Sequence, residues 1–146
     1  MIGLLQRVSA ASVTVEGASV GAIGSGLLVL VAVVPGDTAD HAERLVDRLL
    51  RYRVFEDEAG RMNRSLIETG GGLLLVPQFT LAADTQRGLR PSFTGAAPPG
   101  QGRLLFEVAV AAARARLGER AASGRFGAHM QVSLTNDGPV TLWLEV

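Results

Sequence analysis

The chain has 146 residues, of which 47% are hydrophobic and 19% charged, and its formal net charge is zero. This composition predicts a single folded domain over residues 1–146 and excludes a disordered chain, and the zero net charge indicates no general affinity for polyanions. The chain has no cysteine, no apolar run long enough to span a membrane and no basic N-terminal region like that of a signal peptide. We therefore expect a cytoplasmic protein without disulfides or thiolate metal sites.

Strands predominate at the start of the chain. Residues 1–16 alternate between apolar and polar side chains, and residues 18–23 predict a second strand after a turn at Gly17. Residues 27–34 are apolar on both faces, which is typical of a strand in the centre of a sheet.

A helix is predicted next. Either Asp37 or Thr38 can cap its N-terminus, and it continues to about Arg53. Its apolar side chains recur on one stripe, as in a helix that packs on a core. This stripe contains Ala42, Leu45, Val46, Leu49 and Leu50. The acidic residues 56–58 then predict a solvated turn and not a set of metal ligands.

The following strand ends in an unusual way. Residues 73–76 are all apolar and predict a buried strand that continues to Gln78. Pro77 cannot donate to a sheet ladder, so we expect regular pairing to fail there or to lie at an edge. Gln78 and Thr80 stand where a buried strand would carry valine or isoleucine. Polar side chains and unpaired backbone N–H groups therefore meet at one place, which indicates a functional site.

The last part of the chain predicts a loop, a helix and two strands. Residues 82–99 have no strong period and form a long loop, a kind of segment that is more often functional than idle. Residues 104–117 predict an alanine-rich helix whose inward side chains are Leu105, Val108, Ala112 and Ala115. Residues 130–134 and 140–146 alternate as strands, joined by a turn at Asn136-Asp137-Gly138-Pro139. Strands at both ends and two main helices between them predict the α/β (α+β) class with a mixed sheet.

Thr80 is a candidate nucleophile, but a threonine hydroxyl needs an adjacent base. The chain has two histidines and no lysine. His41 falls in the first turn of a predicted helix, which favours a solvated surface position. His129 precedes a strand near the turn at residues 136–139, where it is either a site residue or a surface histidine. A conventional catalytic triad is therefore poorly supported.

Several segments together carry a family resemblance. They are Gln6-Arg7-Val8, Ser12-Val13-Thr14-Val15, Pro77-Gln78-Phe79-Thr80-Leu81, Ala83-Asp84-Thr85, Arg90-Pro91-Ser92-Phe93 and Asn136-Asp137-Gly138-Pro139-Val140-Thr141. In this order, and without notable gaps, they resemble the D-aminoacyl-tRNA deacylases over essentially the whole chain.

This resemblance implies an enzyme that hydrolyses the ester between a D-amino acid and the terminal adenosine of tRNA. It also implies cleavage of glycine from tRNA, including glycine mischarged on tRNA(Ala), by a cytosolic homodimer with a barrel-like core. The resemblance places Gln78, Phe79 and Thr80 in the catalytic pocket. Gly138-Pro139, braced by Arg7, is cis in that family and enters the pocket of the partner subunit. There its carbonyls occupy the space that an L side chain needs.

The chain departs from the family pattern at two positions. Most bacterial members have serine before the glutamine, where this chain has Pro77, so any contact from that serine to the terminal nucleotide must be lost or replaced. A related animal tRNA deacylase family, which tolerates some L-alanyl substrates, has proline there but alanine after the glutamine. Phe79 and the motif at residues 136–139 follow the D-specific pattern instead. The second departure is His129, where an acidic residue is expected.

Two routes to hydrolysis remain open. In the first, the backbone N–H groups of Phe79 and Thr80 stabilise the oxyanion and the ribose 2′-hydroxyl of the substrate helps to activate water. Gln78 and Thr80 are then positioning groups. In the second, Thr80 is the covalent nucleophile of an esterase or peptidase. Alternatives of another class are a tRNA-binding module without catalysis and a structural dimer.

Further substrate contacts are predicted in the long loop and beside the second motif. Arg87 and Arg90 can contact tRNA phosphates or lie in solvent, and Phe93 can stack on the adenine or anchor its loop. Pro77 and Met130 are predicted to line the substrate pocket, and simple core packing is the alternative for Met130. No metal motif is visible, and we expect neither a metal nor a cofactor.

Overall fold

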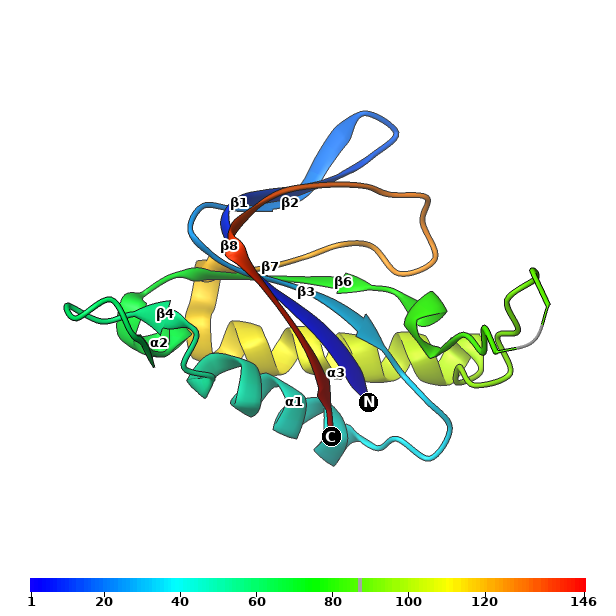
Figure 1. Ribbon diagram of the computed structural model, residues 1–146. Helices are drawn as coiled ribbons and strands as arrows, with labels where there is room; N and C mark the ends of the chain where they lie inside the picture. Colours follow the sequence, from blue (N-terminus) through cyan, green and yellow to red (C-terminus); the bar gives the residue numbers. More distant parts are fainter. Residues whose placement is uncertain (87) are drawn as a thin grey trace.

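The computed structural model describes residues 1–86 and 88–146 (Figure 1). The strands are β1 (Ile2–Val15), β2 (Ala18–Ile23), β3 (Gly26–Ala32), β4 (Phe55–Glu56), β5 (Met62–Arg64), β6 (Gly72–Pro77), β7 (Ala121–Ser123) and β8 (Gln131–Glu145). The helices are α1 (Ala39–Arg51), α2 (Leu66–Thr69) and α3 (Pro99–Leu117), with the 3₁₀ helices η1 (Phe79–Ala82) and η2 (Gly118–Arg120). In these described ranges, no helix combines the length and the apolar character that a membrane crossing requires.

One mixed sheet organises the chain. β1 is antiparallel to β2, β3 and β8, whereas β3, β6 and β7 run parallel to one another. The spatial order is β2-β1-β3-β6-β7, and β8 pairs along nearly the whole length of β1. A separate hairpin joins β4 and β5. The mixed sheet confirms the predicted α/β (α+β) class.

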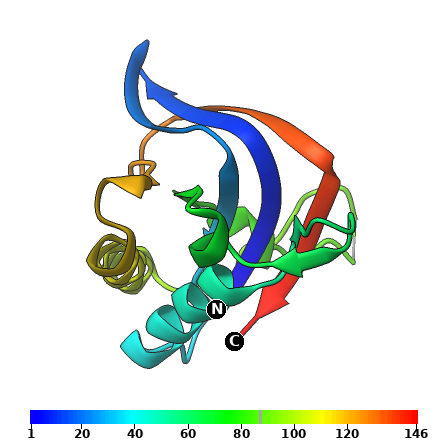
Figure 2. The same ribbon diagram turned by 90° about the vertical axis from the view of Figure 1, so that its left-hand side faces the viewer.

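The sheet curls until its two ends approach each other (Figure 2). A Cβ atom at Gly21 of β2 would lie 2.8 Å from the carbonyl oxygen of Ser123 in β7. No side chain fits at that distance from a backbone atom, so glycine is required where the two strands meet. The core is therefore barrel-like, as the resemblance implied.

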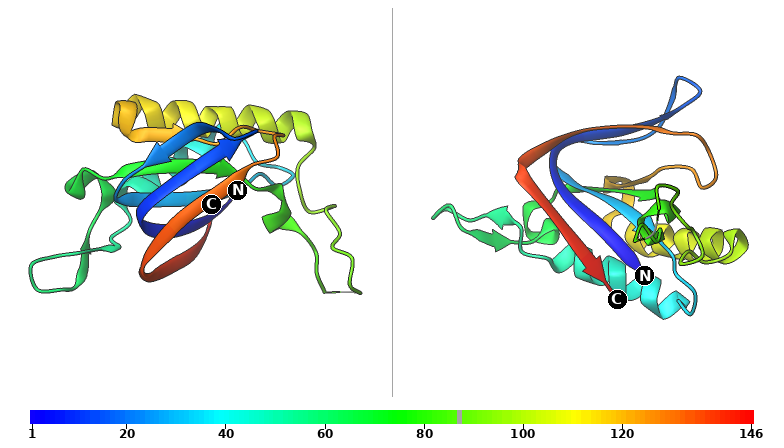
Figure 3. Two further views of the ribbon diagram at one scale, coloured as in Figure 1. Left: turned by 90° about the horizontal axis from the view of Figure 1, so that it is seen from above. Right: turned by 45° about the vertical axis from the view of Figure 1, so that its right-hand side comes forward.

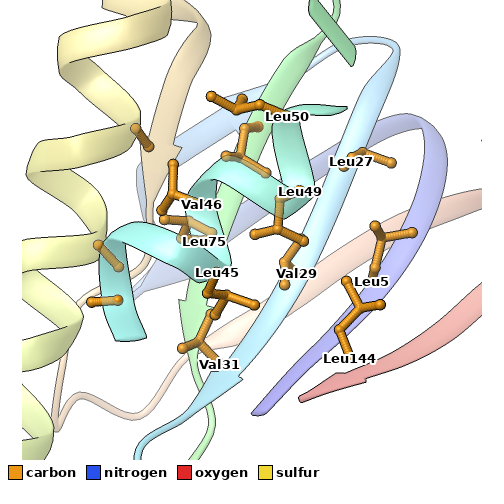
Figure 4. Packing of buried hydrophobic residues seen from close by; sticks show 14 of the residues in the cluster. Leu5, Leu27, Val29, Val31, Leu45, Val46, Leu49, Leu50, Leu75 and Leu144 are labelled. Carbon is orange, nitrogen blue, oxygen red and sulfur yellow. The ribbon is translucent and has the colours of Figure 1, made fainter. Parts of the chain in front are cut away.

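Both faces of the central strands are buried. On one face, α1 and α3 lie against the sheet (Figure 3), and leucine and valine side chains fill the space beneath α1 (Figure 4). Leu45 and Leu49 of α1 pack there with Val29 of β3, and each is fully buried. On the opposite face, Leu28 and Leu74 belong to a second apolar cluster. Burial of each such side chain stabilises the fold by about 1.5–3 kcal/mol, which explains why β3 and β6 are apolar throughout.

α1 begins at one of its two predicted caps. The backbone N–H of Thr38 donates to Nδ1 of His41 at 3.1 Å, so this histidine closes the helix terminus and lies at the surface. Asp37 has a different role. Its buried carboxylate accepts a hydrogen bond of 2.7 Å from the amino group of Met1, which ties the start of β1 to the start of α1.

The expected start of α3 was wrong, and one of its four expected inward side chains is exposed, whereas the expected end at Leu117 and the burial of Leu105 are confirmed. The helix begins at Pro99 and not at residue 104, because proline suits a first helical turn and Gly102 is accommodated beneath the ring of Phe126. Its buried face includes Ala113, whereas Ala115 is exposed. Closely repeated alanines give no clear apolar stripe. The sequence pattern therefore could not show which face of this helix is buried.

The segment between α1 and β6 contains three elements that were not predicted. At the β4–β5 turn, the carboxylate of Asp57 accepts hydrogen bonds from the N–H groups of Arg61 and Ala59, and the first of these does most to hold its pKa below the ordinary value. α2 follows, and its capping box joins the N–H of Ser65 to the carboxylate of Glu68 at 2.6 Å. The Ser-x-x-Glu spacing was the signal that could have found this helix.

Candidate active site

A cavity of about 470 Å³ opens where β3 and β6 end. These strands and the chain that follows β6 form one wall, and the first turns of α3 form a second. Residues 126–130, between β7 and β8, form the third wall. Most of the lining is apolar, as in pockets that bind small organic groups. Four predicted site residues line this one cavity, namely Pro77, Gln78, Phe79 and Met130.

Pro77 ends β6 where the neighbouring strand β7 has already ended. On the β3 side, the N–H of Gln78 donates to the carbonyl of Val31 at 2.7 Å. On the β7 side, the last backbone bond joins the N–H of Gly124 to the carbonyl of Leu75 at 2.8 Å. The ring of Pro77 faces Gly124, since a Cβ atom there would lie 3.3 Å from the proline Cδ. The prediction that pairing fails at this proline is confirmed on the β7 side, where no ladder bond is lost.

Gln78 and Thr80 are joined to each other. The side-chain amide of Gln78 donates to the hydroxyl of Thr80 at 2.5 Å, and Thr80 is exposed in η1. Among the described residues, no histidine or carboxylate makes a hydrogen bond with that hydroxyl. Thr80 therefore lacks the adjacent base that a threonine nucleophile requires.

Two backbone donors lie beside the cavity. Phe79 and Thr80 are the first two residues of η1, a position at which N–H groups have no partner within a helix. No residue in the described ranges accepts a hydrogen bond from either N–H group. The carbonyl of Gln78 is occupied, because it accepts from the N–H of Leu81 at 3.2 Å. The two adjacent donors match the requirement of a developing oxyanion.

The long loop folds back onto the strand end. The ring of Phe93 packs edge-to-face on Phe79 with 5.1 Å between ring centroids, so Phe93 anchors the loop. The backbones of Asp84 and Ser92 pair through two hydrogen bonds of 2.8 and 3.0 Å. Arg90 is exposed in this loop, and Phe93 and Arg90 are not on the cavity wall. Arg87 lies outside the described residues.

Met130 and His129 lie side by side on the third wall. The thioether of Met130 accepts a hydrogen bond of 3.3 Å from the N–H of Arg125. A Cβ atom at Gly124 would lie 2.8 Å from the same sulfur, so glycine leaves room for this methionine. His129 is exposed and lines the cavity, although it is far in sequence from the strand end at Gln78.

The motif at residues 136–139 is not a turn between two strands, which corrects the prediction. β8 is continuous and pairs with β1 on both sides of the motif. Residues 137–140 of β8 stand opposite Arg7 alone, and we name them the Gly-Pro bulge. Asn136 closes this bulge, because its side-chain oxygen accepts from the N–H of Val140 at 2.7 Å. The turn-forming residues are thus used within a strand.

Arg7 lies beneath the Gly-Pro bulge and is only 7% exposed. Its Nε donates to the carbonyl of Asp137 at 2.8 Å, and its Nη1 donates to the carbonyl of Val54 at 2.6 Å. The Gly138-Pro139 peptide bond is cis, and Gly138 has a φ of +148°, a conformation that favours glycine. The guanidinium therefore holds the bulge by its backbone.

The two motifs lie apart within one chain. Of the described residues, none from the Gly-Pro bulge lines the cavity at Gln78. The bulge belongs to β8, which pairs with β1 only among the described strands. Trp143 on the same strand is 49% exposed, and Leu134 is 36% exposed. The bulge is thus carried on an outer strand with large apolar side chains at the surface.

The second and third walls contain aromatic residues that were not predicted from the sequence. The rings of Phe106 in α3 and Phe126 lie with centroids 6.4 Å apart, and both line the cavity. Arg103 lies over the ring of Phe126, with 5.2 Å between its guanidinium carbon and the centroid. Phe126 stands between Gly124 and Gly127, and an aromatic residue among glycines was the only available signal.

Comparisons with known proteins find a family and relatives that match nearly the whole chain. A family model described as D-Tyr-tRNA(Tyr) deacylase matches residues 4–145. A D-aminoacyl-tRNA deacylase of Thioalkalivibrio sulfidiphilus is 64% identical over 146 residues, which are 100% of this chain and 97% of the relative. One of Azotobacter vinelandii is 61% identical over 145 residues, which are 99% of each chain.

Solved structures share the fold. A structure described as the c-Myc DNA Unwinding Element Binding Protein superposes with a TM-score of 0.94 at 39% identity, covering 100% of this chain and 99% of that one. A probable eukaryotic D-amino acid tRNA deacylase superposes with a TM-score of 0.88, covering 99% of this chain and 98% of that one. At 19% identity, the second likeness shows the fold alone.

Proposed function

This chain belongs to the D-Tyr-tRNA(Tyr) deacylase family, and we propose that it cleaves D-aminoacyl-tRNA in the cavity beside Gln78, Phe79 and Thr80. Its activity is that of a D-aminoacyl-tRNA deacylase, a hydrolase of the ester that joins an amino acid to tRNA. One observation carries the choice of site, namely that an apolar cavity is lined by Phe79, whose backbone N–H and that of the adjacent Thr80 have no described partner. A cytoplasmic location is part of this proposal, and a substrate used in translation supports it.

The proposed chemistry uses backbone donors and the substrate's own ribose. Water attacks the ester carbonyl carbon, and the N–H groups of Phe79 and Thr80 bind the oxyanion that develops. The bond to the ribose oxygen then breaks, and that oxygen takes up a proton. The 2′-hydroxyl of the terminal adenosine helps to activate the water, and no described histidine or carboxylate is hydrogen-bonded to Thr80 to act in its place. An aminoacyl ester is already activated, so positioning and oxyanion stabilisation suffice.

The terminal adenosine occupies the apolar part of the cavity. Pro77 and Met130 lie on its walls with the rings of Phe106 and Phe126. Apolar and aromatic surfaces of this kind suit the flat faces of a base. The amide of Gln78 fixes the Thr80 hydroxyl, so both side chains position the strand end and take no part in covalent chemistry.

Chiral selection comes from a second subunit. In a homodimer, the Gly-Pro bulge of one subunit enters the cavity of the other, where its carbonyls occupy the space that an L side chain needs. Two observations support this arrangement. The bulge is exposed on an outer strand, and among the described residues it contributes nothing to the cavity of its own chain. Glycine has no side chain to exclude, so glycyl-tRNA, including tRNA(Ala) mischarged with glycine, is also a substrate.

Mixed dimers test this proposal directly. A Phe79→Pro chain, which lacks one of the two oxyanion donors, and a Gly138→Val chain are each expected to be inactive as homodimers, because every site then carries one defect. If the bulge acts on the partner, a mixed dimer contains one site with neither defect. Co-expression should then restore roughly a quarter of wild-type turnover of D-Tyr-tRNA, since roughly half of randomly paired dimers are mixed and each has one intact site. No recovery in dimers shown to be mixed would overturn the partner arrangement.

The threonine-nucleophile alternative makes the opposite prediction for Thr80. We expect Thr80→Ala to retain turnover within about tenfold of wild type, as for a positioning group. Complete loss of turnover, with the fold and tRNA binding retained, would favour a covalent role. D-Tyr-tRNA that ends in 2′-deoxyadenosine should be hydrolysed far more slowly, and normal turnover of that substrate would refute assistance by the ribose. A binding module without catalysis would leave both substrates intact.

A further inference from the structure

A second hollow lies behind the third wall of the cavity. We name it the arginine groove, and it has a volume of about 420 Å³ between α3 and residues 123–126. Phe106 and Phe126 line both the groove and the cavity, so the two hollows share a wall. The two hollows are therefore neighbours, and a chain that extended past these rings would reach the groove.

The groove is strongly basic in a protein of zero net charge. Arg103 and Arg114 of α3 line it with Arg125 from the opposite side, and Glu107 is its one acidic residue. None of the described carboxylates forms an ion pair with these three arginines, although other arginines of the chain are paired. Three guanidinium groups and one carboxylate give the lining of the groove a formal net charge of +2. This charge favours an anionic ligand.

The arrangement of the arginines suits a linear polyanion. Arg103 and Arg114 are eleven positions apart on α3, a distance of about 16 Å at 1.5 Å per residue. This length accommodates several stacked nucleotides at about 3.4 Å each. Arg103 is already held over the ring of Phe126, which reduces the side-chain entropy lost when it binds a ligand. Guanidinium groups also match the geometry of phosphate oxygens.

We propose that the arginine groove binds the phosphodiester backbone of the nucleotides that immediately precede the terminal adenosine of the substrate. This inference rests on the proposed function, in which that adenosine occupies the neighbouring cavity. Phosphate contacts position a nucleic acid without reading its sequence, so the groove serves acceptor ends of any tRNA. It takes precedence over Arg90 as a phosphate site, because Arg90 lines neither hollow.

The test compares two substrates in one double variant, Arg114→Gln with Arg125→Gln. With D-Tyr-tRNA, we expect KM to rise about tenfold. The slope of log(kcat/KM) against log[salt] should fall in magnitude by about 1.4, at roughly 0.7 per single-strand phosphate contact. With D-tyrosyl-adenosine, which has no phosphate, the rate should stay at the wild-type value. The charge-retaining variant Arg114→Lys with Arg125→Lys should recover most of the salt slope.

The matched control removes two charges elsewhere. Arg44→Gln with Arg51→Gln alters exposed arginines of α1 that line neither hollow, and it should leave KM and the salt slope unchanged. Equal effects in the control and the groove variant, or a groove variant that matches wild type, would overturn the inference. An equal loss on D-tyrosyl-adenosine would also overturn it, because the arginines would then act through the cavity.

Failure of the proposed function is distinguishable from failure of the groove. Wild-type protein that leaves D-Tyr-tRNA intact would overturn the proposed function. Phosphate binding by the groove is then tested separately. Fluorescence anisotropy measures the affinity of each protein for a single-stranded oligonucleotide with the tRNA acceptor sequence. The groove variant should bind this oligonucleotide about tenfold more weakly than the control. Equal affinities would overturn the groove whatever the outcome of the hydrolysis assay.

Discussion

Arg7 and Asp137, which are 130 residues apart in the sequence, are joined by a 2.8 Å hydrogen bond from the Arg7 Nε to the Asp137 carbonyl. The same guanidinium donates to the carbonyl of Val54 at 2.6 Å, so it links the Gly-Pro bulge to the chain that follows α1. The bond to Val54 is buried and the bond to Asp137 is partly buried, and hydrogen bonds from a charged donor are strong where water is excluded. The bulge is therefore fixed to the core of its own subunit.

Replacing Arg7 with methionine should release the bulge and destabilise the fold. The buried carbonyl of Val54 and the partly buried carbonyl of Asp137 lose their donors, and an unpaired buried group costs about 1–3 kcal/mol in the free energy of unfolding. We also expect kcat/KM for D-Tyr-tRNA to fall at least about tenfold, because the bulge is no longer held in register. Urea denaturation and a deacylation assay measure the two effects. Arg48→Met is the control, since Arg48 makes a similar bond to the carbonyl of Glu145 at an exposed position. Equal effects in the two variants would contradict the bracing role.

Gly138→Ala should disturb the bulge locally. Its φ of +148° costs a non-glycine residue about 1–3 kcal/mol, and a Cβ atom would lie 2.8 Å from the backbone nitrogen of Val140. Gly17→Ala is the control, because Gly17 also has a positive φ, of +80°. A Cβ atom at Gly17 would have no neighbour within 4 Å, so this variant introduces backbone strain without a steric clash. Both variants should lose stability, but only Gly138→Ala should lose turnover when assayed well below its melting temperature. Full activity in Gly138→Ala would show that the site does not depend on the bulge.

Pro77→Ser tests the departure from the family pattern. The new N–H faces Gly124, where the β7 ladder has ended, so it gains no strand partner. Stability should fall by about 0.4–1 kcal/mol, because serine gives the unfolded chain more conformational freedom. The N–H of Gln78 still bonds to the carbonyl of Val31, so we expect kcat/KM to stay within about threefold of wild type. A much larger loss, with the melting temperature nearly unchanged, would mean that the site requires the proline ring.

Glu68 should contribute to stability in a pH-dependent way. Its hydrogen bonds with the side chain and backbone of Ser65 lower the pKa of its carboxyl below the ordinary value of 4.5. A lowered folded-state pKa stabilises the protein above pH 4.5, and this contribution disappears as the pH falls through the folded-state value. Glu68→Gln should therefore melt below wild type at pH 7, and the difference should shrink below pH 4.5. Thermal melts of both proteins over this range provide the check, and a constant difference would refute the assignment.

Much of the fold follows from local patterns in the sequence. The apolar runs of β3 and β6 predict strands buried on both faces, and the stripe through Leu45 and Leu49 predicts the packing face of α1. The strand end at Gln78 was predictable as part of a site, because polar residues interrupt a buried strand there. In each case a short stretch of sequence is sufficient to predict the local structure.

The remaining features depend on long-range contacts that no local pattern contains. Residues 136–139 are typical of a turn, yet pairing of β8 with β1 on both sides keeps them within one strand. The buried face of α3 could not be predicted, because alanine is compatible with buried and exposed positions alike. The cavity wall at Phe106 and Phe126 forms only when α3 packs beside the segment before β8. The arginine groove was missed for the same reason.

The ratio of the hydrolysis rates of D-Tyr-tRNA and L-Tyr-tRNA tests most directly whether the Gly-Pro bulge excludes L side chains. The initial rates of hydrolysis of D-Tyr-tRNA and L-Tyr-tRNA should be compared at matched concentrations of enzyme and substrate. Exclusion of the L side chain by the Gly-Pro bulge predicts rapid release of D-tyrosine and a rate with L-Tyr-tRNA no higher than the spontaneous rate. Hydrolysis of both substrates at similar rates would contradict the account.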